Sequence, residues 1–235
     1  MIDEKTRVVI LTGAGISAES GIKTFRASDG LWEEHRIEDV ATPRGWASNP
    51  ELVWSFYQQR RRQLLEVEPN SGHKALVELE KFLDEFLLVT QNVDDLHERA
   101  GSQNLIHMHG DLESLRCVEC GHIEVMMDEE HLGDEFVACN HCSARVRPHI
   151  VWFGEPPLQL HKIENAIRNC DVFIAIGTSG HVSPASGFLY TARQHGAHTI
   201  GINLDPPQNV FFFDEFHQGK AGELLPSLVQ KWITE

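Results

Sequence analysis

Short apolar runs rich in β-branched residues recur along the chain, and each ends at a glycine or at polar residues. The first, residues 7–12, breaks at Gly13 and predicts a buried strand. Further strands are predicted at residues 86–90, 105–108, 171–176 and 198–202. Helical patterns separate several of them, at 71–84, 158–169 and 185–195, and a last helix is expected at about 223–232. This alternation predicts an α/β fold: a Rossmann-like parallel sheet with helices on both faces.

Two stretches interrupt the alternation. Residues 27–69 predict loop and helices without a strand, and residues 111–149 carry most of the cysteines. Both are interpreted as insertions that meet as a second, smaller domain. The predicted division is 1–26, 70–110 and 150–235 for the sheet domain, and 27–69 and 111–149 for the small domain. A cleft between them would lie at the carboxyl ends of the strands, where open α/β sheets bind ligands.

Two C-x-x-C pairs, Cys117 with Cys120 and Cys139 with Cys142, indicate a metal site. Each pair places two thiolates on one tight turn, and two such turns can close a tetrahedral cage around one Zn2+. Disulfides are disfavoured because no secretory signal is recognisable and cytosolic thiols stay reduced. Four protein ligands leave no open coordination position, so this zinc is expected to be structural.

Composition and charge narrow the possible partners. The chain is 41% hydrophobic and 23% charged, which is ordinary for a soluble globular protein. A net charge of −15 argues against binding to nucleic acid, which requires clustered Lys and Arg. No apolar run approaches the roughly 18 residues of a membrane span. A cytoplasmic protein without membrane contact is therefore expected.

The segment that follows the first strand is rich in glycine. Gly13, Ala14 and Gly15 would let the backbone approach a pyrophosphate, with Ile16 and Ser17 opening a helix turn. The third glycine of a dinucleotide-binding motif is absent. Taken alone, the segment is more simply explained as a strand-to-helix turn.

The longer string GAGISAESGIKTFR (residues 13–26) resembles the signature of sirtuins, the NAD-dependent protein lysine deacylases. Four further strings resemble the same family in the same order: TQNVDDLH (90–97), HMHG (107–110), GTS (177–179) and NLD (203–205). The cysteine pairs fall where the family carries its zinc, and the resemblance runs from about residue 7 to 225. It implies NAD as co-substrate, one structural zinc, acylated lysine in proteins or peptides as substrate, and a monomer.

The resemblance also implies catalytic roles. In a sirtuin-like reaction the acyl oxygen attacks ribose C1′ as nicotinamide leaves, and a base then activates a ribose hydroxyl. A histidine suits that base because its pKa is near 6.5. His109 matches the family's position before Gly110, whereas the strand period would put His107 on the same face and does not separate the two. Asn92 and Asp94 would orient the nicotinamide. Most other histidines, His97 included, are expected on helix surfaces.

The remaining NAD contacts that the resemblance implies come from the five strings above and from Trp32 and Ala221 outside them. Phe25 would shield C1′, Arg26 would meet phosphate or ribose oxygens, and Gln91 would contact the nicotinamide ribose. The full set expected to bind NAD is Gly13, Ala14, Gly15, Ser17, Glu19, Phe25, Arg26, Trp32, Gln91, Asn92, Val93, Asp94, His109, Gly177, Thr178, Ser179, Asn203, Leu204, Asp205 and Ala221.

A substrate peptide would lie along Val151, Trp152, Phe153 and Gly154, an extended apolar segment that resembles the family's β-augmentation strand. Such recognition uses backbone hydrogen bonds and is tolerant of peptide sequence. Val151 and Phe153 are expected to point one way and Trp152 the other.

The acyl preference depends on a helix predicted at residues 49–64, with an Asn cap and Pro at its first position. Arg60 falls on its apolar stripe with Tyr57, whereas Arg61 and Arg62 are expected to face solvent. An inward arginine needs an anion, either an internal acid or a ligand carboxylate, unless its side chain snorkels to the edge of the protein. Tyr57, Arg60 and the small Ala41 resemble class III sirtuins, which remove succinyl, malonyl and glutaryl groups and usually acetyl as well.

Two alternatives stay open. A mono-ADP-ribosyltransferase would use the same NAD site with another nucleophile. A non-catalytic sensor would bind NAD or acyl-lysine without releasing nicotinamide.

Overall fold

The computed structural model describes residues 2–23, 31–32, 34–126 and 129–234. Its largest element is a six-stranded sheet in the order β11-β10-β9-β1-β4-β5, in which every pair is parallel. Its strands are β1 (Val8–Thr12), β4 (Phe86–Thr90), β5 (Leu105–His107), β9 (Val172–Ile176), β10 (His198–Asn203) and β11 (Glu215–Gln218). The predicted parallel α/β fold is confirmed.

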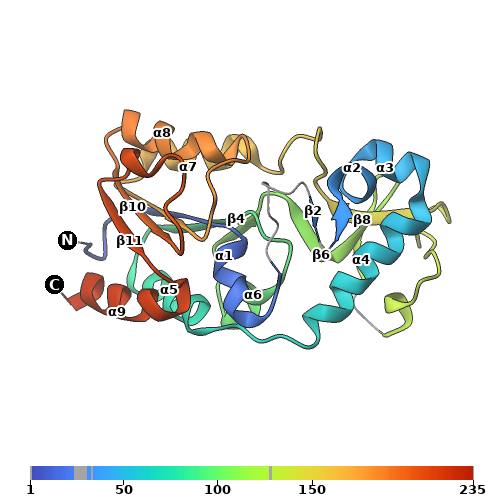
Figure 1. Ribbon diagram of the computed structural model, residues 1–235, viewed down its shortest axis with the longest axis horizontal. Coiled ribbons are helices and arrows are strands. Elements are labelled where there is room, and N and C mark those ends of the chain that lie inside the picture. The colour runs from blue at the N-terminus through green and yellow to red at the C-terminus, as the bar shows by residue number, and fades with distance from the viewer. Residues whose placement is uncertain (1, 24–30, 33, 127–128, 235) are drawn as a thin grey trace.

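Helices cover both faces of this sheet (Figure 1). On one face α5 (Ser71–Phe82) and α9 (Ala221–Thr234) pack against Val8 and Ile10 of β1. On the other face α7 (Leu160–Asn169) and α8 (Ala185–Gln194) pack against Val9 and Leu11. Because successive strand residues point to opposite faces, an unbroken apolar strand supplies both cores. We call this part, residues 2–23, 65–109 and 151–234, the sheet region.

The rest of the described chain, residues 31–32, 34–64, 110–126 and 129–150, forms the small region. An antiparallel sheet in the order β7-β6-β8 lies at its centre. Around it are helices and two-residue strands from the earlier segment (Figure 1). The elements are β2 (Leu31–Trp32), β3 (His35–Arg36), α2 (Ile37–Val40), α3 (Pro43–Ser48), α4 (Pro50–Leu64), β6 (Gly110–Cys117), β7 (Ile123–Val125), η2 (Glu129–Leu132) and β8 (Val146–Ile150).

The expectation of no strand in residues 27–69 is wrong, because β2 and β3 pair antiparallel there. Strands of two residues are too short to leave an alternating pattern in the sequence. The predicted helix cap is confirmed: the Asn49 side chain accepts a hydrogen bond from the Leu52 amide at 3.1 Å.

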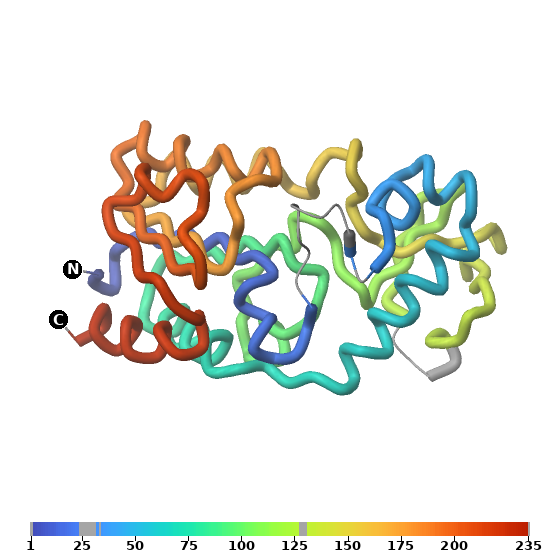
Figure 2. The backbone as a smooth tube through the Cα atoms, in the orientation of Figure 1, coloured from blue at the N-terminus to red at the C-terminus, as the bar shows by residue number. Residues whose placement is uncertain are grey.

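Figure 2 shows the chain entering the small region twice and both termini at the far end of the sheet region. Short connecting elements at the centre, α1 (Ala14–Ser17), η1 (Ala18–Ser20) and α6 (Leu96–Ala100), lie beside the strand ends that face the small region. Within the described part of the chain, no helix has both the length and the apolar character needed to cross a bilayer.

Candidate active site

A cavity of about 830 Å³ lies where the strand ends of the sheet region meet the small region. Its volume is in the range of small-molecule and cofactor sites. All described residues expected to bind NAD line it. Phe25 and Arg26 lie outside the described residues. Ala41, Tyr57, Val151, Trp152, Phe153 and Gly154, expected to bind the substrate, also line it.

The glycine turn forms part of the cavity wall through close packing. A Cβ atom at Gly15 would lie 2.6 Å from the Gly177 Cα, and one at Gly177 would lie 2.5 Å from the Ile16 nitrogen. The Gly13 and Gly15 amides donate to the Ile176 and Gly177 carbonyls, each at 2.9 Å. Glycine at positions 15 and 177 therefore allows the turns after β1 and β9 to come together. The N–H groups of Gly13 and Gly15 are already used in hydrogen bonds within the protein.

His109 is oriented by a backbone carbonyl. Its Nδ1 lies 3.0 Å from the Gln91 carbonyl oxygen. Because a carbonyl only accepts, Nδ1 carries the proton, and in the neutral ring Nε2 is left with a lone pair. Burial lowers the pKa of His109, and the Gln91 carbonyl opposes this only in part. The ring is thus neutral near pH 7 and can take a proton at Nε2.

His107 has different surroundings. Its Nδ1 lies 3.0 Å from the Asn92 carbonyl oxygen, and its Nε2 lies 2.6 Å from a carboxylate oxygen of Glu98. His109 lines the cavity, whereas His107 lies behind the loop that forms its wall. The expected common face is wrong because β5 ends at His107, so the strand period does not extend to His109.

Asn92 and Asp94 are both nearly buried, at 7% and 5% exposure. The Asn92 amide donates to the Ser17 hydroxyl at 3.0 Å. Burial raises the pKa of Asp94 to about 6, although hydrogen bonds from Ser17 and from the Leu96 amide oppose the rise. A carboxyl group of this kind can accept from, and when protonated donate to, a carboxamide.

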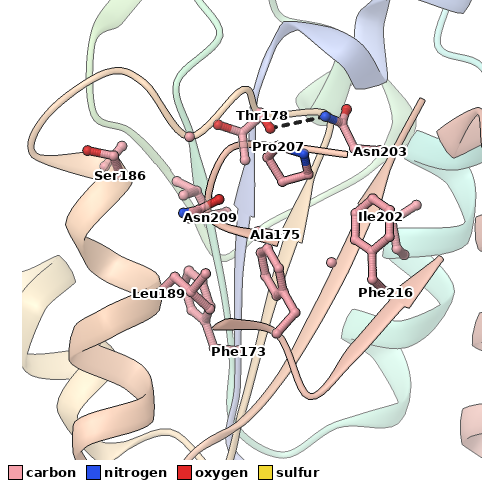
Figure 3. A pocket seen from close by; sticks show the side chains of 15 residues that line it. Phe173, Ala175, Thr178, Ser186, Leu189, Ile202, Asn203, Pro207, Asn209 and Phe216 are labelled. Atoms are coloured by element: carbon pink, nitrogen blue, oxygen red, sulfur yellow. Dashed lines mark hydrogen bonds between the residues drawn. The ribbon is translucent and has the colours of Figure 1, made fainter. Parts of the chain in front are cut away.

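At the other end of the cavity, the side chain of Asn203 at the end of β10 binds backbone carbonyls that follow β9 and β10. The Asn203 amide donates to the Thr178 carbonyl at 3.2 Å, the contact drawn in Figure 3, and to the Asp205 carbonyl at 2.9 Å. Below them Phe173, Leu189 and Phe216 line a second cavity of about 20 Å³, room for roughly one water. This small cavity is too small for a ligand larger than water.

Glu19 joins two distant segments at the cavity edge. Its carboxylate accepts from the Gly222 amide at 2.8 Å, in the first turn of α9. The negative charge is favourable there because the helix N-terminus carries partial positive charge. Lys220, just before α9, lines the cavity and was missed by sequence reasoning, as was the loop of Val182, Ser183 and Pro184. A lysine before a helix start is a weak signal, and the loop carries none.

The small-region wall is centred on Trp152. Its indole N–H donates to the Tyr57 hydroxyl at 3.0 Å, and its amide donates to Glu155 at 2.9 Å. The Arg147 guanidinium lies 3.7 Å from the Trp152 ring centroid and binds Glu155 at 2.7 Å. Burial raises the pKa of Tyr57, which keeps its hydroxyl proton available for donation.

The segment that was expected to bind a peptide is extended over fewer residues than predicted. β8 ends at Ile150, and Phe153 and Gly154 form a turn in which Gly154 has φ +94°. The Val151 amide donates to the His109 carbonyl at 2.8 Å, and the Phe153 amide to the Ala41 carbonyl at 3.0 Å. Trp152 is buried and Phe153 is 48% exposed, as expected from their alternation.

Three successive arginines on α4 have different surroundings. Arg60 donates to the Phe56 carbonyl at 2.8 Å and stacks 4.1 Å from the Phe56 ring centroid, and it is not among the described residues that line the cavity. The expectation that Arg61 faces solvent is wrong. It is fully buried and donates to Gln58 at 2.8 Å and to the His131 carbonyl at 3.0 Å. The segment around η2 covers this face of α4, and its carbonyl groups accept the hydrogen bonds that water would otherwise accept from the arginines.

Arg62 is half-exposed and binds the same segment. It donates to the Leu132 carbonyl at 2.6 Å and forms a longer ion pair with Asp134 at 3.4 Å. Together with Gln58, which donates to the His131 and Gly133 carbonyls, Arg61 and Arg62 hold this segment against α4.

The four paired cysteines converge, with all sulfur atoms within 4.8 Å of one another. The Cys117 and Cys142 sulfurs are 3.4 Å apart, and those of Cys120 and Cys139 are 3.8 Å apart. Sulfurs bound at ~2.3 Å around a tetrahedral zinc lie ~3.8 Å apart, so the donor set fits one structural Zn2+. Cys170 is buried in the sheet region and takes no part.

Comparison with known proteins agrees with this geometry. Residues 13–184 match the model of the Sir2 family. The chain is 54% identical over 233 residues to an NAD-dependent protein deacylase of Salmonella typhimurium, a match that covers 98% of this chain and 85% of that protein. It is equally similar to an NAD-dependent protein deacylase of Pasteurella multocida, of which 99% is covered.

Solved structures of Sir2 proteins have the same fold as this chain. A Sir2 homologue in complex with NAD has a TM-score of 0.89 at 41% identity, over 97% of this chain and 90% of the other. A Sir2 complex with a p53 peptide and NAD+ has a TM-score of 0.83 at 28% identity, over 97% and 94%. A parallel sheet joined across a ligand cavity to a four-cysteine module defines the class of protein. This chain belongs to the Sir2 family.

Proposed function

We propose that this chain is an NAD-dependent protein lysine deacylase that produces nicotinamide, O-acyl-ADP-ribose and free lysine. The observation that carries the proposal is the placement of His109 in the cavity wall, where its Nδ1 donates to the Gln91 carbonyl and its Nε2 is left as a base. Relatives at 54% identity named as deacylases and a homologue bound to NAD support it.

In this proposal NAD supplies the leaving nicotinamide and the ribose carbon that receives the acyl oxygen. Asn92 and Asp94 hold the nicotinamide carboxamide, with Ser17 fixing the Asn92 amide. His109 Nε2 takes a proton from a ribose hydroxyl, as a group with a pKa below its usual value can near neutral pH. Trp152 and the other buried apolar groups around it exclude water from the reacting atoms.

We further propose that the acyl pocket accepts acidic acyl groups as well as acetyl. Tyr57 and Ala41 line the cavity, and the Tyr57 hydroxyl accepts from Trp152 while its own proton can be donated to a ligand. Arg60 lies one helical turn from Tyr57 on α4, at the Phe56 ring. A rotation of its side chain would place a guanidinium beside Tyr57, a pair suited to a succinyl or malonyl carboxylate.

The division into two domains, with residues 1–26, 70–110 and 150–235 in one and residues 27–69 and 111–149 in the other, remains our proposal. Separate hydrophobic clusters support it, since one pair of clusters contains the six-stranded sheet and another pair contains α4 and the cysteine module. The zinc would hold the cysteine module in shape and play no part in the chemistry.

The test is nicotinamide release from NAD with and without acetyl-, succinyl- and malonyl-lysine versions of one peptide. Acyl-dependent release with free lysine as product would support the deacylase. Release with ADP-ribose transferred to protein would favour the transferase, and no release with any of the three acyl peptides would favour a sensor.

A further inference from the structure

Two neighbouring histidines bind the carbonyl groups of two neighbouring residues. His109 binds the Gln91 carbonyl and His107 binds the Asn92 carbonyl, each through Nδ1 at 3.0 Å. Only His107 has a carboxylate at its other nitrogen, Glu98 at 2.6 Å. His109 faces the cavity, whereas the Glu98–His107 pair lies behind the loop that carries Asn92.

We propose that His107 and Glu98 are a positioning pair that fixes the Asn92 peptide, and through it the contact with nicotinamide. This inference rests on the proposed function, because it assumes that Asn92 binds the nicotinamide carboxamide. Asn92 is held at three points: its amide donates to the Thr90 hydroxyl at 3.0 Å, its side chain to Ser17 at 3.0 Å, and its carbonyl accepts from His107.

The charges around His107 favour its cationic form. Burial lowers its pKa, but Glu98, the Asn92 carbonyl and Asp111 on β6 together raise it above the usual value. Two further acids, Asp95 just before α6 and Glu113 on β6, extend this acidic surround. With both nitrogens protonated, the ring donates to Asn92 and to Glu98 at once and has no lone pair with which to act as a base.

The pair also acts on Asp94. The charge of His107 lowers the pKa of that carboxyl, opposing the larger effect of burial. Loss of His107 would therefore raise the Asp94 pKa further and loosen the Asn92 peptide. Both changes concern the nicotinamide end of the cavity, whereas the adenosine end at Asn203 and Asp205 is untouched.

The experiment compares His107→Ala, His107→Asn and Glu98→Gln with His195→Ala. His195 is a matched control, because its Nδ1 lies 2.9 Å from the Thr191 carbonyl, and it is exposed after the end of α8 and does not line the cavity. Nicotinamide inhibition of deacylation, nicotinamide exchange into NAD, binding of ADP-ribose by calorimetry, and the pH profile of each variant are measured.

For His107→Ala we expect nicotinamide inhibition and exchange to weaken about tenfold, as for one lost charge-assisted hydrogen bond. ADP-ribose binding stays within about twofold, and the acid limb of the pH profile moves to higher pH. Asparagine places an amide nitrogen near the position of Nδ1, so His107→Asn recovers most of the loss. Glu98→Gln gives a smaller loss in the same direction, and His195→Ala changes nothing.

Three outcomes would overturn the inference. If His107→Ala weakened the effects of nicotinamide and the binding of ADP-ribose equally, and also lowered the melting temperature, His107 would have a merely structural role. Full nicotinamide exchange with no product formation would make His107 the base. No rescue by His107→Asn would exclude the carbonyl contact. The proposed function is tested separately, on the wild-type protein. It would be refuted if the wild type released no nicotinamide in response to an acyl peptide, whatever the variants do.

Discussion

The two walls of the cleft are stabilised in different ways. In the sheet region, parallel strands buried on both faces hold the glycine turn, the Asn92 loop and the strand ends at fixed positions. In the small region, α4 is joined to the segment around η2 by Gln58, Arg61 and Arg62, which donate to backbone carbonyls. The turns at its outer end depend on four thiols. Under the proposed function, the chemistry lies on the wall built from the six-stranded sheet. Acyl selection lies on the wall whose apolar clusters are supplemented by these polar contacts and by the four thiols.

Loss of zinc should have the largest effect and should separate the two walls. Cys117→Ser or Cys142→Ser is expected to abolish metal binding and to disorder the small region, since a structural zinc contributes ~10–16 kcal/mol to folding. Deacylation is lost, whereas ADP-ribose binding, which depends mainly on the sheet region, is retained in part.

Metal analysis, calorimetry with ADP-ribose and limited proteolysis would measure these effects. Cys170→Ala is the matched control, because Cys170 is buried in the sheet region and should be dispensable for metal binding. Full activity in a protein shown to lack zinc would contradict the prediction.

Removal of the base tests the sheet-region wall alone. His109→Ala should lower deacylation by ~10^2–10^4 for acetyl and succinyl peptides alike, because the same ribose hydroxyl is activated in both reactions. NAD binding and nicotinamide exchange should persist. If His107→Ala causes the greater loss of product formation, the assignment of the base is wrong.

The same contrast between the two regions explains how much of the fold and of the site could be predicted from the sequence. Strands such as β1, β4 and β9 are continuous apolar runs, so periodicity found them and placed the ligand site at their ends. β11 is a short edge strand with little apolar pattern, and β2 is a two-residue strand, so both were missed. The described residues expected to bind NAD line one cavity, and most of them directly follow a predicted strand or end one.

Side chains buried by distant segments were not predictable. His97 was expected on a helix surface, yet it is fully buried, 3.0 Å from the Thr12 hydroxyl and packed on the ring of His73. Arg61 is buried by carbonyl groups about 70 residues further along the chain. No local pattern encodes a partner at that separation, since helical spacing specifies only a face.

The buried histidine pair gives the sheet region a sensitivity to acid. Burial lowers the pKa of His73 to about 4 and that of His97 well below its usual value. A depressed histidine pKa means that the unfolded chain binds more protons, so stability falls as pH drops from about 6.5 toward 4. For His73 alone the loss is ~3 kcal/mol at the low end of this window.

Urea unfolding between pH 7 and pH 4.5 measures this loss, with zinc release followed separately because acid also frees thiolate ligands. Asp94 acts in the opposite direction, since its raised pKa makes the folded state less favourable as pH rises through about 6. The variant His73→Gln should flatten the stability profile. A profile that is flat in the wild type would contradict the assignment of a neutral His73.

The smallest predicted effect concerns the small-region wall alone. Arg60→Met should raise the KM for a succinyl peptide at least about tenfold, the loss of roughly one charge-assisted hydrogen bond, and should leave deacetylation unchanged because an acetyl group has no carboxylate. Tyr57→Phe should act in the same direction more weakly, with a small loss of stability because the Trp152 indole N–H loses its acceptor. Gln59→Met, on the exposed side of α4, is the control. Steady-state kinetics on matched peptides decide between two roles for Arg60. Equal loss of both activities would mean that Arg60 serves α4 through the Phe56 carbonyl and ring that it contacts, and that the acyl preference has another origin.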